Sequence, residues 1–275
     1  MELSTMQPWL YLASTIMFIL GIKQLSRVKT ARRGNTISAI GMGLAVLGTL
    51  VTLDGIDWRW IAGGVAVGAV IGVVLATRVA MTAMPELVAA LNGVGGMSSA
   101  LVAGSFAWRN VVQAEGTQVP AAAIGSVAAG NTALSILIGM LTLTGSVIAF
   151  LKLQGRLKKG APILLPGRHV LNAAMVLALT AGSVWWCAFA VGPEQTQMGL
   201  IGLMILASAL GVLVVIPIGG ADMPVVVSLL NAYSGLAAAA AGFVLGNALL
   251  LIAGAMVGAS GLILTQIMCV AMNRT

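Results

Sequence analysis

Long apolar segments recur along the whole chain, and each has about the length that a helix needs to cross a membrane. A spanning helix requires about 20 mostly apolar residues, because the hydrocarbon core of a bilayer is about 30 Å thick. The segments do not alternate polar and apolar residues, as the strands of a closed barrel do. The sequence therefore predicts an all-α, polytopic transmembrane helix bundle, a single domain over residues 1–275. About nine spans are expected, at residues 4–22, 35–53, 60–77, 84–106, 127–151, 170–190, 198–217, 223–244 and 247–270.

The composition supports lipid as the main surroundings of this bundle. Hydrophobic residues make up 59% of the chain and charged residues only 8%, whereas a soluble domain carries about 25% charged residues. The 35 glycines suit close packing of helices in lipid. Stripes of glycine predict where helices pack, and they lie at Gly64, Gly68 and Gly72, at Gly242 and Gly246, and at Gly254 and Gly258.

The basic residues predict the orientation of the bundle. The net charge of +7 is spread over short loops between apolar segments and forms no single stripe, which argues against a nucleic-acid partner. With nine spans, twelve of the fourteen lysines and arginines, all but Arg59 and Arg109, fall on one side. Because positive loops remain in the cytoplasm, the N-terminus is expected outside and the C-terminus inside.

Neutral polar residues are the candidate functional groups, because charged residues are absent from the middle of the predicted spans. Polar groups inside a bilayer are costly, and each is a functional candidate by default. The helical period places those of segments 84–106, 127–151 and 223–244 on faces that together would line a polar seam. Two acids lie at the ends of such segments. The candidates are Asn92, Ser135, Thr142, Ser146, Ser228, Asn231 and Ser234, with the acids Glu86 and Asp222.

Each candidate also has a plain structural interpretation. Serine and threonine hydroxyls bond back to their own helix or join helices, and Asp222 is placed to cap the helix that begins near Pro224. His169 has no neighbouring ligand set, so no metal site is predicted. The run from Gly93 to Gly96 follows no strand and is discounted as a dinucleotide fingerprint. The chain by itself shows no residue set for hydride or group transfer.

Several long motifs resemble the β subunit of the proton-translocating NAD(P) transhydrogenase family. The longest is the stretch GADMPVVVSLLNAYSG at 220–235, followed by AAAAAGF at 237–243 and GAMVGASG at 254–261. Further matches are MTAMPELV at 81–88, TGSVIAF at 144–150, PGRH at 166–169 and IMCVAMNR at 267–274. These motifs are specific, and together they extend over nearly the whole chain.

The resemblance implies a function for the bundle. In that family, hydride passes between NAD(H) and NADP(H) on two soluble domains, and the membrane domain couples this transfer to inward proton movement. The chain is then expected to be the membrane part of a translocase that binds neither cofactor itself. Its expected partners are membrane lipid, transmembrane helices and an NAD(H)-binding domain of a partner subunit, and the NADP(H)-binding domain that follows position 275 in β subunits. The complex is expected to be dimeric and to lie in a bacterial inner membrane.

The resemblance also implies roles for particular residues. Asp222 and Asn231 match positions implicated in coupling and proton conduction, Ser146 matches a serine of the conducting region, and Arg274 matches an arginine at the junction with the NADP(H) domain. Asn92 is a departure, because some members carry a histidine there that is proposed to bind the proton. Asparagine does not titrate near neutral pH. Either a partner helix supplies an ionisable group, which we favour, or protons move along waters without a protein carrier.

A secondary transporter for a small solute is the main alternative. Polar seams and glycine-rich helices serve both functions, but no convincing repeat relates the two halves of the sequence, as inverted repeats do in many transporters. A purely structural membrane scaffold is a third possibility, and the clustered amides argue weakly against it.

Overall fold

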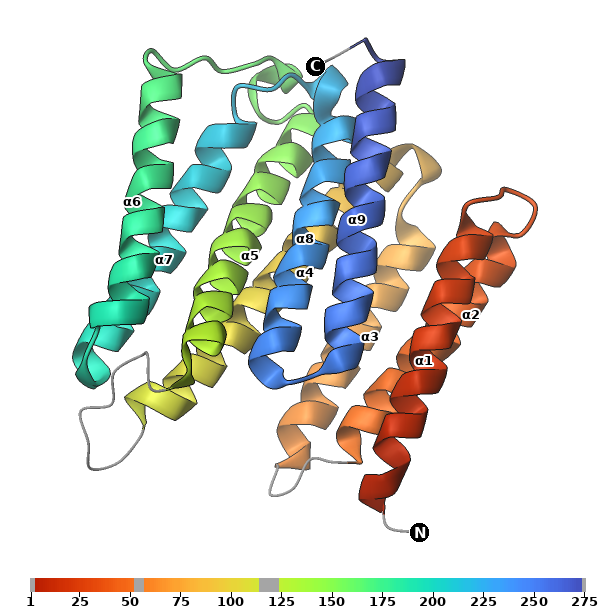
Figure 1. The fold of residues 1–275 in the computed structure, drawn as a ribbon. Coiled ribbons are helices and arrows are strands. Elements are labelled where there is room, and N and C mark those ends of the chain that lie inside the picture. Colours follow the sequence, from red (N-terminus) through yellow and green to blue (C-terminus); the bar gives the residue numbers. More distant parts are fainter. Residues whose placement is uncertain (1–2, 52–56, 114–123, 274–275) are drawn as a thin grey trace. The chain divides into compact units, whose positions relative to one another are not determined.

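The structure is a computed structural model that describes residues 3–51, 57–113 and 124–273. Within these ranges the chain is helical and contains no strand, which confirms the predicted all-α class (Figure 1). The described ranges hold nine α-helices: α1 (Leu3–Leu25), α2 (Ala31–Leu50), α3 (Trp58–Arg78), α4 (Met84–Ala107), α5 (Ser126–Leu153), α6 (Arg168–Phe189), α7 (Gly192–Val215), α8 (Met223–Leu245) and α9 (Ala248–Ala271).

Eight of these nine helices are long and apolar enough to cross a membrane. The exception is α2, whose first turns carry Arg32, Arg33 and Asn35 and so lower its hydropathy. The ninth crossing therefore stays a prediction. The length and apolar composition of the other eight helices identify the chain as a multi-pass membrane protein.

Most predicted segments agree with the observed helices to within about four residues, but α7 begins six residues earlier than predicted. The polar residues after Gly192 suggest a loop, yet Pro193 and Glu194 occupy the first turn of α7. Proline fits there because the first helical residues need no N–H donor, and an acid is favourable at the positive end of the helix dipole. At its C-terminal end, α4 continues into a π-helical turn, Trp108–Val112.

The helices form two compact units, Met1–Val79 and Ala80–Thr275. In unit 1, α1 and α2 pack along a glycine stripe on α2. Gly34, Gly41 and Gly48 are seven residues apart, which is about two helical turns, so they share one buried face. Ser14 donates a hydrogen bond to the carbonyl oxygen of Gly41 at 2.7 Å across this contact. The third helix, α3, buries none of its side chains.

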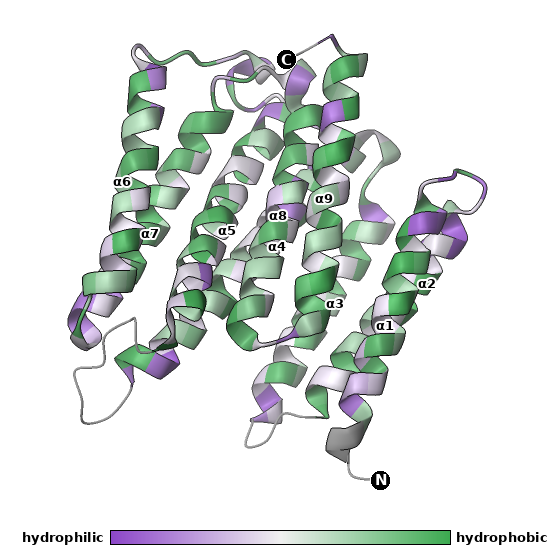
Figure 2. Cartoon of the chain, viewed as in Figure 1, coloured by the Kyte–Doolittle hydropathy of each residue, from purple (hydrophilic) through white to green (hydrophobic). Residues whose placement is uncertain are grey.

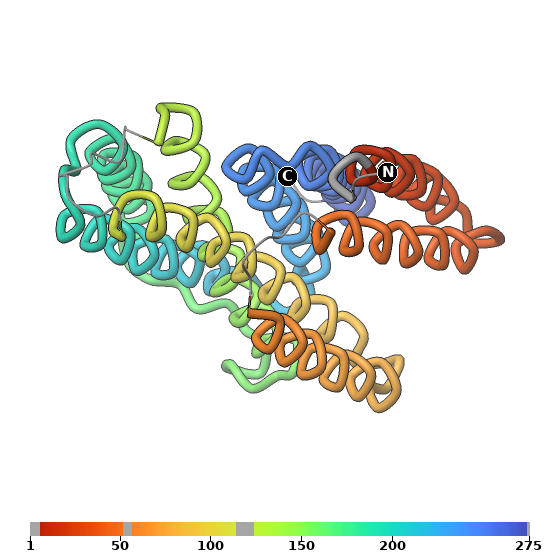
Figure 3. Tube along the Cα trace, turned by 90° about the horizontal axis from the view of Figure 1, so that it is seen from below, coloured from red at the N-terminus to blue at the C-terminus, as the bar shows by residue number. Residues whose placement is uncertain are grey.

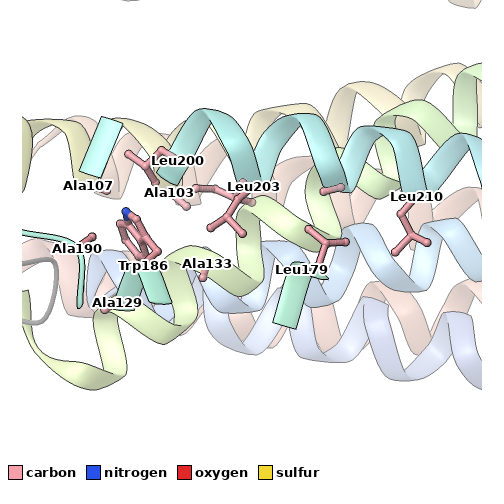
Figure 4. Close-up of a cluster of buried hydrophobic side chains, with 12 residues drawn as sticks. Ala103, Ala107, Ala129, Ala133, Leu179, Trp186, Ala190, Leu200, Leu203 and Leu210 are labelled. Carbon is pink, nitrogen blue, oxygen red and sulfur yellow. The ribbon is translucent and has the colours of Figure 1, made fainter. Parts of the chain in front are cut away.

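In unit 2, α5 packs against α4, α6, α7 and α8, and α9 packs against α8. Seen end-on, α6 and α7 lie on one side of unit 2 and α8 and α9 on the other (Figure 3). A hydrophobic cluster fills the space between α4, α5, α6 and α7 around the fully buried Trp186 (Figure 4). The indole N–H of Trp186 donates to the carbonyl oxygen of Thr196 at 3.3 Å.

The predicted glycine stripes have different outcomes. Gly254 and Gly258 of α9 do contact α8, because a Cβ placed on Gly254 would lie 2.7 Å from the carbonyl oxygen of Gly235. Gly246 instead ends α8 in the left-handed conformation, with φ 63°. A Cβ on any glycine of the predicted stripe of α3 would meet no atom of the described residues within 4 Å. An interface on α3 therefore stays a prediction.

Candidate functional site

Three of the polar candidates, Asn92, Ser135 and Ser234, lie where α4, α5 and α8 meet. On α4, Asn92 is half-buried, and its amide nitrogen donates to the carbonyl oxygen of Val227 on α8 at 3.1 Å. In return, the Ser234 hydroxyl of α8 donates to the carbonyl oxygen of Asn92 at 3.1 Å. Asn92 and Ser234 therefore join α4 to α8 by two hydrogen bonds that run in opposite directions.

The predicted polar face of α5 points into the protein. Ser135 and Thr142 are fully buried, and Ser146 is 1% exposed. Ser135 donates to carbonyl oxygens of two other helices, Ser99 on α4 at 3.1 Å and Ala237 on α8 at 3.0 Å. Thr142 bonds back to its own helix, at Ile138, at 2.7 Å. Both hydroxyls thus have the structural partners that serines and threonines commonly find in membrane helices.

Ser146 differs from these two residues, because its buried hydroxyl has no hydrogen-bond partner among the described residues. It faces α4 at Gly93, where a Cβ placed on the glycine would lie 3.1 Å from the Ser146 Cβ. Thr132, on the same helix, is also buried with an unpartnered hydroxyl. A buried hydroxyl without a partner is costly and is commonly satisfied by an ordered water. The Ser146 hydroxyl is therefore a polar group on the α4–α5 contact that remains available for a hydrogen bond among the described residues.

The glycines after Asn92 serve helix packing. Gly93 faces Ser146, and a Cβ placed on Gly96 would lie 2.6 Å from the carbonyl oxygen of Gly139 on α5. The backbones of α4 and α5 are in contact there. This supports the discounting of the Gly93–Gly96 run as a dinucleotide fingerprint.

The structure does not bring all three polar residues of α8 to this junction. Ser228 faces α9, where its hydroxyl lies 3.4 Å from the carbonyl oxygen of Gly261 and accepts a hydrogen bond from Thr265 at 3.0 Å. Asn231 is half-buried between Ser228 and Ser234 in the sequence of α8. Residues three apart on a helix are displaced by about 60° around its axis, so six residues turn the direction by about 120°. Ser228 and Ser234 consequently contact different helices.

Asp222 lies at one end of unit 2, which we call the basic end. Here α5, α7 and α9 end and α4, α6 and α8 begin, and hydrophilic residues gather at such helix ends while the middles are mostly hydrophobic (Figure 2). Asp222 closes a short 3-10 turn, Gly220–Asp222, and is the N-cap residue of α8. Its carboxylate accepts no capping hydrogen bond from the first turn of α8, so the capping role weighed from the sequence is not seen. The basic residues of this end are Lys152, Arg156, Lys158, Lys159 and Arg168.

The sequence did not single out Lys152, which was counted only among the basic loop residues that set the orientation. Lys152 is in the last turn of α5 and is only 2% exposed. Its ammonium group donates to the carbonyl oxygens of Ile216 and Ile218, both at 2.5 Å, and of Ala161 at 3.3 Å. The signal that distinguishes it is its position directly after an apolar run, three residues before the first helix-ending glycine, Gly155.

The remaining candidates lie apart from the junction. Glu86 is half-buried in the first turn of α4, at the basic end, where a negative charge is favourable. His169 is exposed, and its ring nitrogen Nε2 accepts a hydrogen bond from Nε of Arg168 at 3.3 Å. The described part of the chain holds no group of three potential metal ligands. Arg274 lies outside the described residues.

The sequence also matches known proteins. The profile of the family described as NAD(P) transhydrogenase beta subunit matches residues 7–275. The chain is 44% identical over 268 residues to NAD(P) transhydrogenase subunit beta of Rhodospirillum rubrum, and the same figures hold for the protein of a named strain of that species. The match covers 96% of this chain and 55% of the relative. The chain thus spans about half of the length of the curated relatives that it matches.

Proposed function

The chain belongs to the family of NAD(P) transhydrogenase beta subunits, and from this premise we propose that it is the proton-conducting membrane domain of a proton-translocating transhydrogenase. It couples proton movement to hydride transfer between NAD(H) and NADP(H), which takes place on soluble domains. The observation that carries the proposal is the junction of α4, α5 and α8, where Asn92 is bonded to α8 and the next residue, Gly93, faces Ser146, whose buried hydroxyl has no partner among the described residues.

The proposed pathway runs along the contact of α4 and α5 toward the basic end. Ser146 holds a water beside Asn92, and neighbouring polar groups on α5 and α8 orient the waters that follow. In this pathway Ser135, Thr142, Ser228, Asn231 and Ser234 are proposed to position helices or waters, and Glu86 to act at its basic end. Asp222 is proposed to sense the NADP(H)-binding domain, with Arg274 at the same interface.

The proposed orientation in the membrane is inferred from the distribution of the basic residues. The basic end faces the cytoplasm of a bacterium, in its inner membrane, with the N-terminus outside and the C-terminus inside. A reporter enzyme fused after Thr275 should be active in the cytoplasm, and periplasmic activity would contradict this orientation. The NADP(H)-binding domain docks at the basic end. A partner subunit supplies further helices and the NAD(H)-binding domain, in a dimeric complex.

The proton-carrying group is proposed to come from a helix of the partner subunit. Asn92 stays neutral, and a gate needs a group whose charge changes between states, for which histidine is best suited. Neutralising each ionisable residue of the partner's transmembrane helices should therefore identify one residue that is essential for proton uptake. Full uptake in all of those variants would favour a water chain without a protein carrier.

Reconstitution in liposomes tests the proposed function. The complete complex is inserted into vesicles that contain a pH-sensitive dye, and NADP-dependent hydride transfer is followed together with lumenal pH. We expect both signals to require this chain and to rise and fall together. Hydride transfer without any proton movement, in vesicles shown to be tight, would remove the basis of the proposal.

Replacing Ser146 by alanine should lower proton conduction without lowering the stability of the bundle. The hydroxyl has no partner among the described residues, so its removal should cost the fold little, whereas loss of the water that it is proposed to hold should lower proton uptake about 10-fold or more. Ser135→Ala is the matched comparison on the same helix. It deletes a hydroxyl bonded to two other helices and should destabilise the bundle by about 0.6–1.7 kcal/mol.

The two alanine variants are compared by thermal unfolding in detergent and by proton uptake per assembled complex. Equal proton uptake by Ser146→Ala and the unsubstituted complex would exclude Ser146 from the pathway. A larger loss of stability in Ser146→Ala than in Ser135→Ala would show that its hydroxyl is bonded in the assembled protein.

A further inference from the structure

Lys152 is a buried cation whose hydrogen-bonding capacity is filled by backbone. A lysine ammonium has three N–H donors, and that of Lys152 has three acceptors, the carbonyl oxygens of Ala161, Ile216 and Ile218. A buried charge without hydrogen bonds is strongly unfavourable, so these three carbonyl groups are what keeps the ammonium group in place.

The acceptors belong to two segments that follow different helices. Ile216 and Ile218 come directly after α7, where the last carbonyl groups of a helix lack partners and carry the negative end of its dipole. Ala161 follows the short turn Lys158–Gly160 in the loop between α5 and α6. The Lys152 side chain therefore donates hydrogen bonds to carbonyl groups that follow α7. It also donates to the loop between α5 and α6, and so holds both segments at the end of α5.

Two backbone contacts reinforce this arrangement. The N–H of Ile163 donates to the carbonyl oxygen of Ile216 at 3.2 Å, so the loop and the end of α7 are also bonded to each other. A Cβ placed on Gly220 would lie 3.4 Å from the Cα of Gly160 and 3.7 Å from the carbonyl oxygen of Lys152. The turn that ends in Asp222 thus rests on the last turn of α5 and on its loop.

We propose that Lys152 is a positioning residue that fixes the segment from Ile216 to Asp222 on the end of α5. When a partner docks at Asp222 and displaces this segment, α5 is displaced with it. Asp222 is four residues after Ile218, and Ser146 is six residues before Lys152 on the same uninterrupted helix. A helix is stiff over this distance, and a displacement of the segment is passed to the face that carries Ser146. The inference rests on the proposed function of Asp222 and Ser146.

Lys152→Met tests this role, because methionine fills similar space without the charge or the donors. Lys23→Met is the control, since Lys23 is an exposed lysine in the last turn of α1, outside the basic end, and its replacement removes the same charge. In the complete complex in liposomes, we expect Lys152→Met to assemble and to lower proton-coupled hydride transfer at least about fivefold, the lower end of usual coupling effects. Lys23→Met should behave as the unsubstituted complex.

A measurement of mobility makes the test independent of activity. A spin label is attached at Ala221→Cys, an exposed position beside Asp222, in complexes whose chain has Cys187 and Cys269 replaced by alanine. We expect the label to be more mobile with Lys152→Met than without it, and its mobility to be unchanged with Lys23→Met. Unchanged mobility with Lys152→Met would overturn the proposal even if transfer declined.

Further outcomes are also decisive. If Lys152→Met prevents assembly, Lys152→Arg keeps the charge while its planar guanidinium group cannot match three converging carbonyl groups in the same way. Loss of assembly in both variants would leave Lys152 a structural role only and overturn the proposal. If the unsubstituted complex moves no protons, the proposed function fails separately, and the mobility of the label at position 221 still shows whether Lys152 holds the segment.

Discussion

Replacing Gly139 by leucine is expected to prevent α4 and α5 from packing and to abolish most of the folded protein. A Cβ placed on Gly139 would lie 3.0 Å from the Ala100 Cβ and 3.1 Å from its backbone nitrogen. Backbone atoms cannot rotate away as a flexible side chain does, so the two helices must separate. Overpacking in a core typically costs about 1–3 kcal/mol, and we expect at least about 3 kcal/mol at this backbone contact. The yield of monodisperse protein in detergent and its thermal unfolding measure the effect.

Gly130→Leu is the matched control for this substitution. Gly130 lies on the same helix, is exposed, and a Cβ placed on it would meet no described atom within 4 Å. It should change the unfolding temperature little. Normal yield and stability of Gly139→Leu would mean that α4 and α5 are farther apart in the membrane than in the structure.

Replacing Asp222 by asparagine is expected to uncouple proton movement while the bundle still assembles. The carboxylate makes no capping bond to the first turn of α8, so the substitution removes no cap from that helix. Coupling free energies between sites are typically 1–3 kcal/mol, and we expect a loss of about 5–150-fold in proton-coupled hydride transfer. Transfer and proton uptake per assembled complex are measured together in liposomes.

Glu194→Gln controls for the loss of an acid at a helix start. Glu194 is exposed in the first turn of α7, away from the basic end, and its change to an amide alters net charge by the same amount. It should leave coupling intact. If Asp222→Asn instead abolished assembly, Asp222 would be a structural residue and the proposed sensing role would fall.

Hydropathy was sufficient to predict the number and positions of the helices, because a bilayer requires long apolar segments in whatever order they pack. Its errors have local causes. The start of α7 was placed too late because Glu194 and Gln195 resemble a loop, although the helix dipole and proline favour a helix there. The arrangement of helices was not predictable, because lipid and protein surfaces of membrane helices are equally apolar.

The candidate site was predictable as a set of faces but not as a set of contacts. The helical period correctly placed Ser135, Thr142 and Ser146 on one buried face of α5. It did not separate Ser135, which is bonded to two helices, from Ser146, which has no partner, because that depends on neighbouring backbones. Lys152 was misassigned for the same reason, since the carbonyl groups that bury it lie 9, 64 and 66 residues away in the sequence.

The paired hydrogen bonds between Asn92 and α8 have a consequence for how the pathway opens. The side-chain amide of Asn92 donates to Val227 of α8, and the backbone carbonyl oxygen of Asn92 accepts from Ser234, seven residues and about two helical turns beyond Val227. A displacement that separates α4 from α8 at Asn92 must therefore break both hydrogen bonds, one made by a side chain of each helix. Together they oppose separation of the two helices more than either bond would alone.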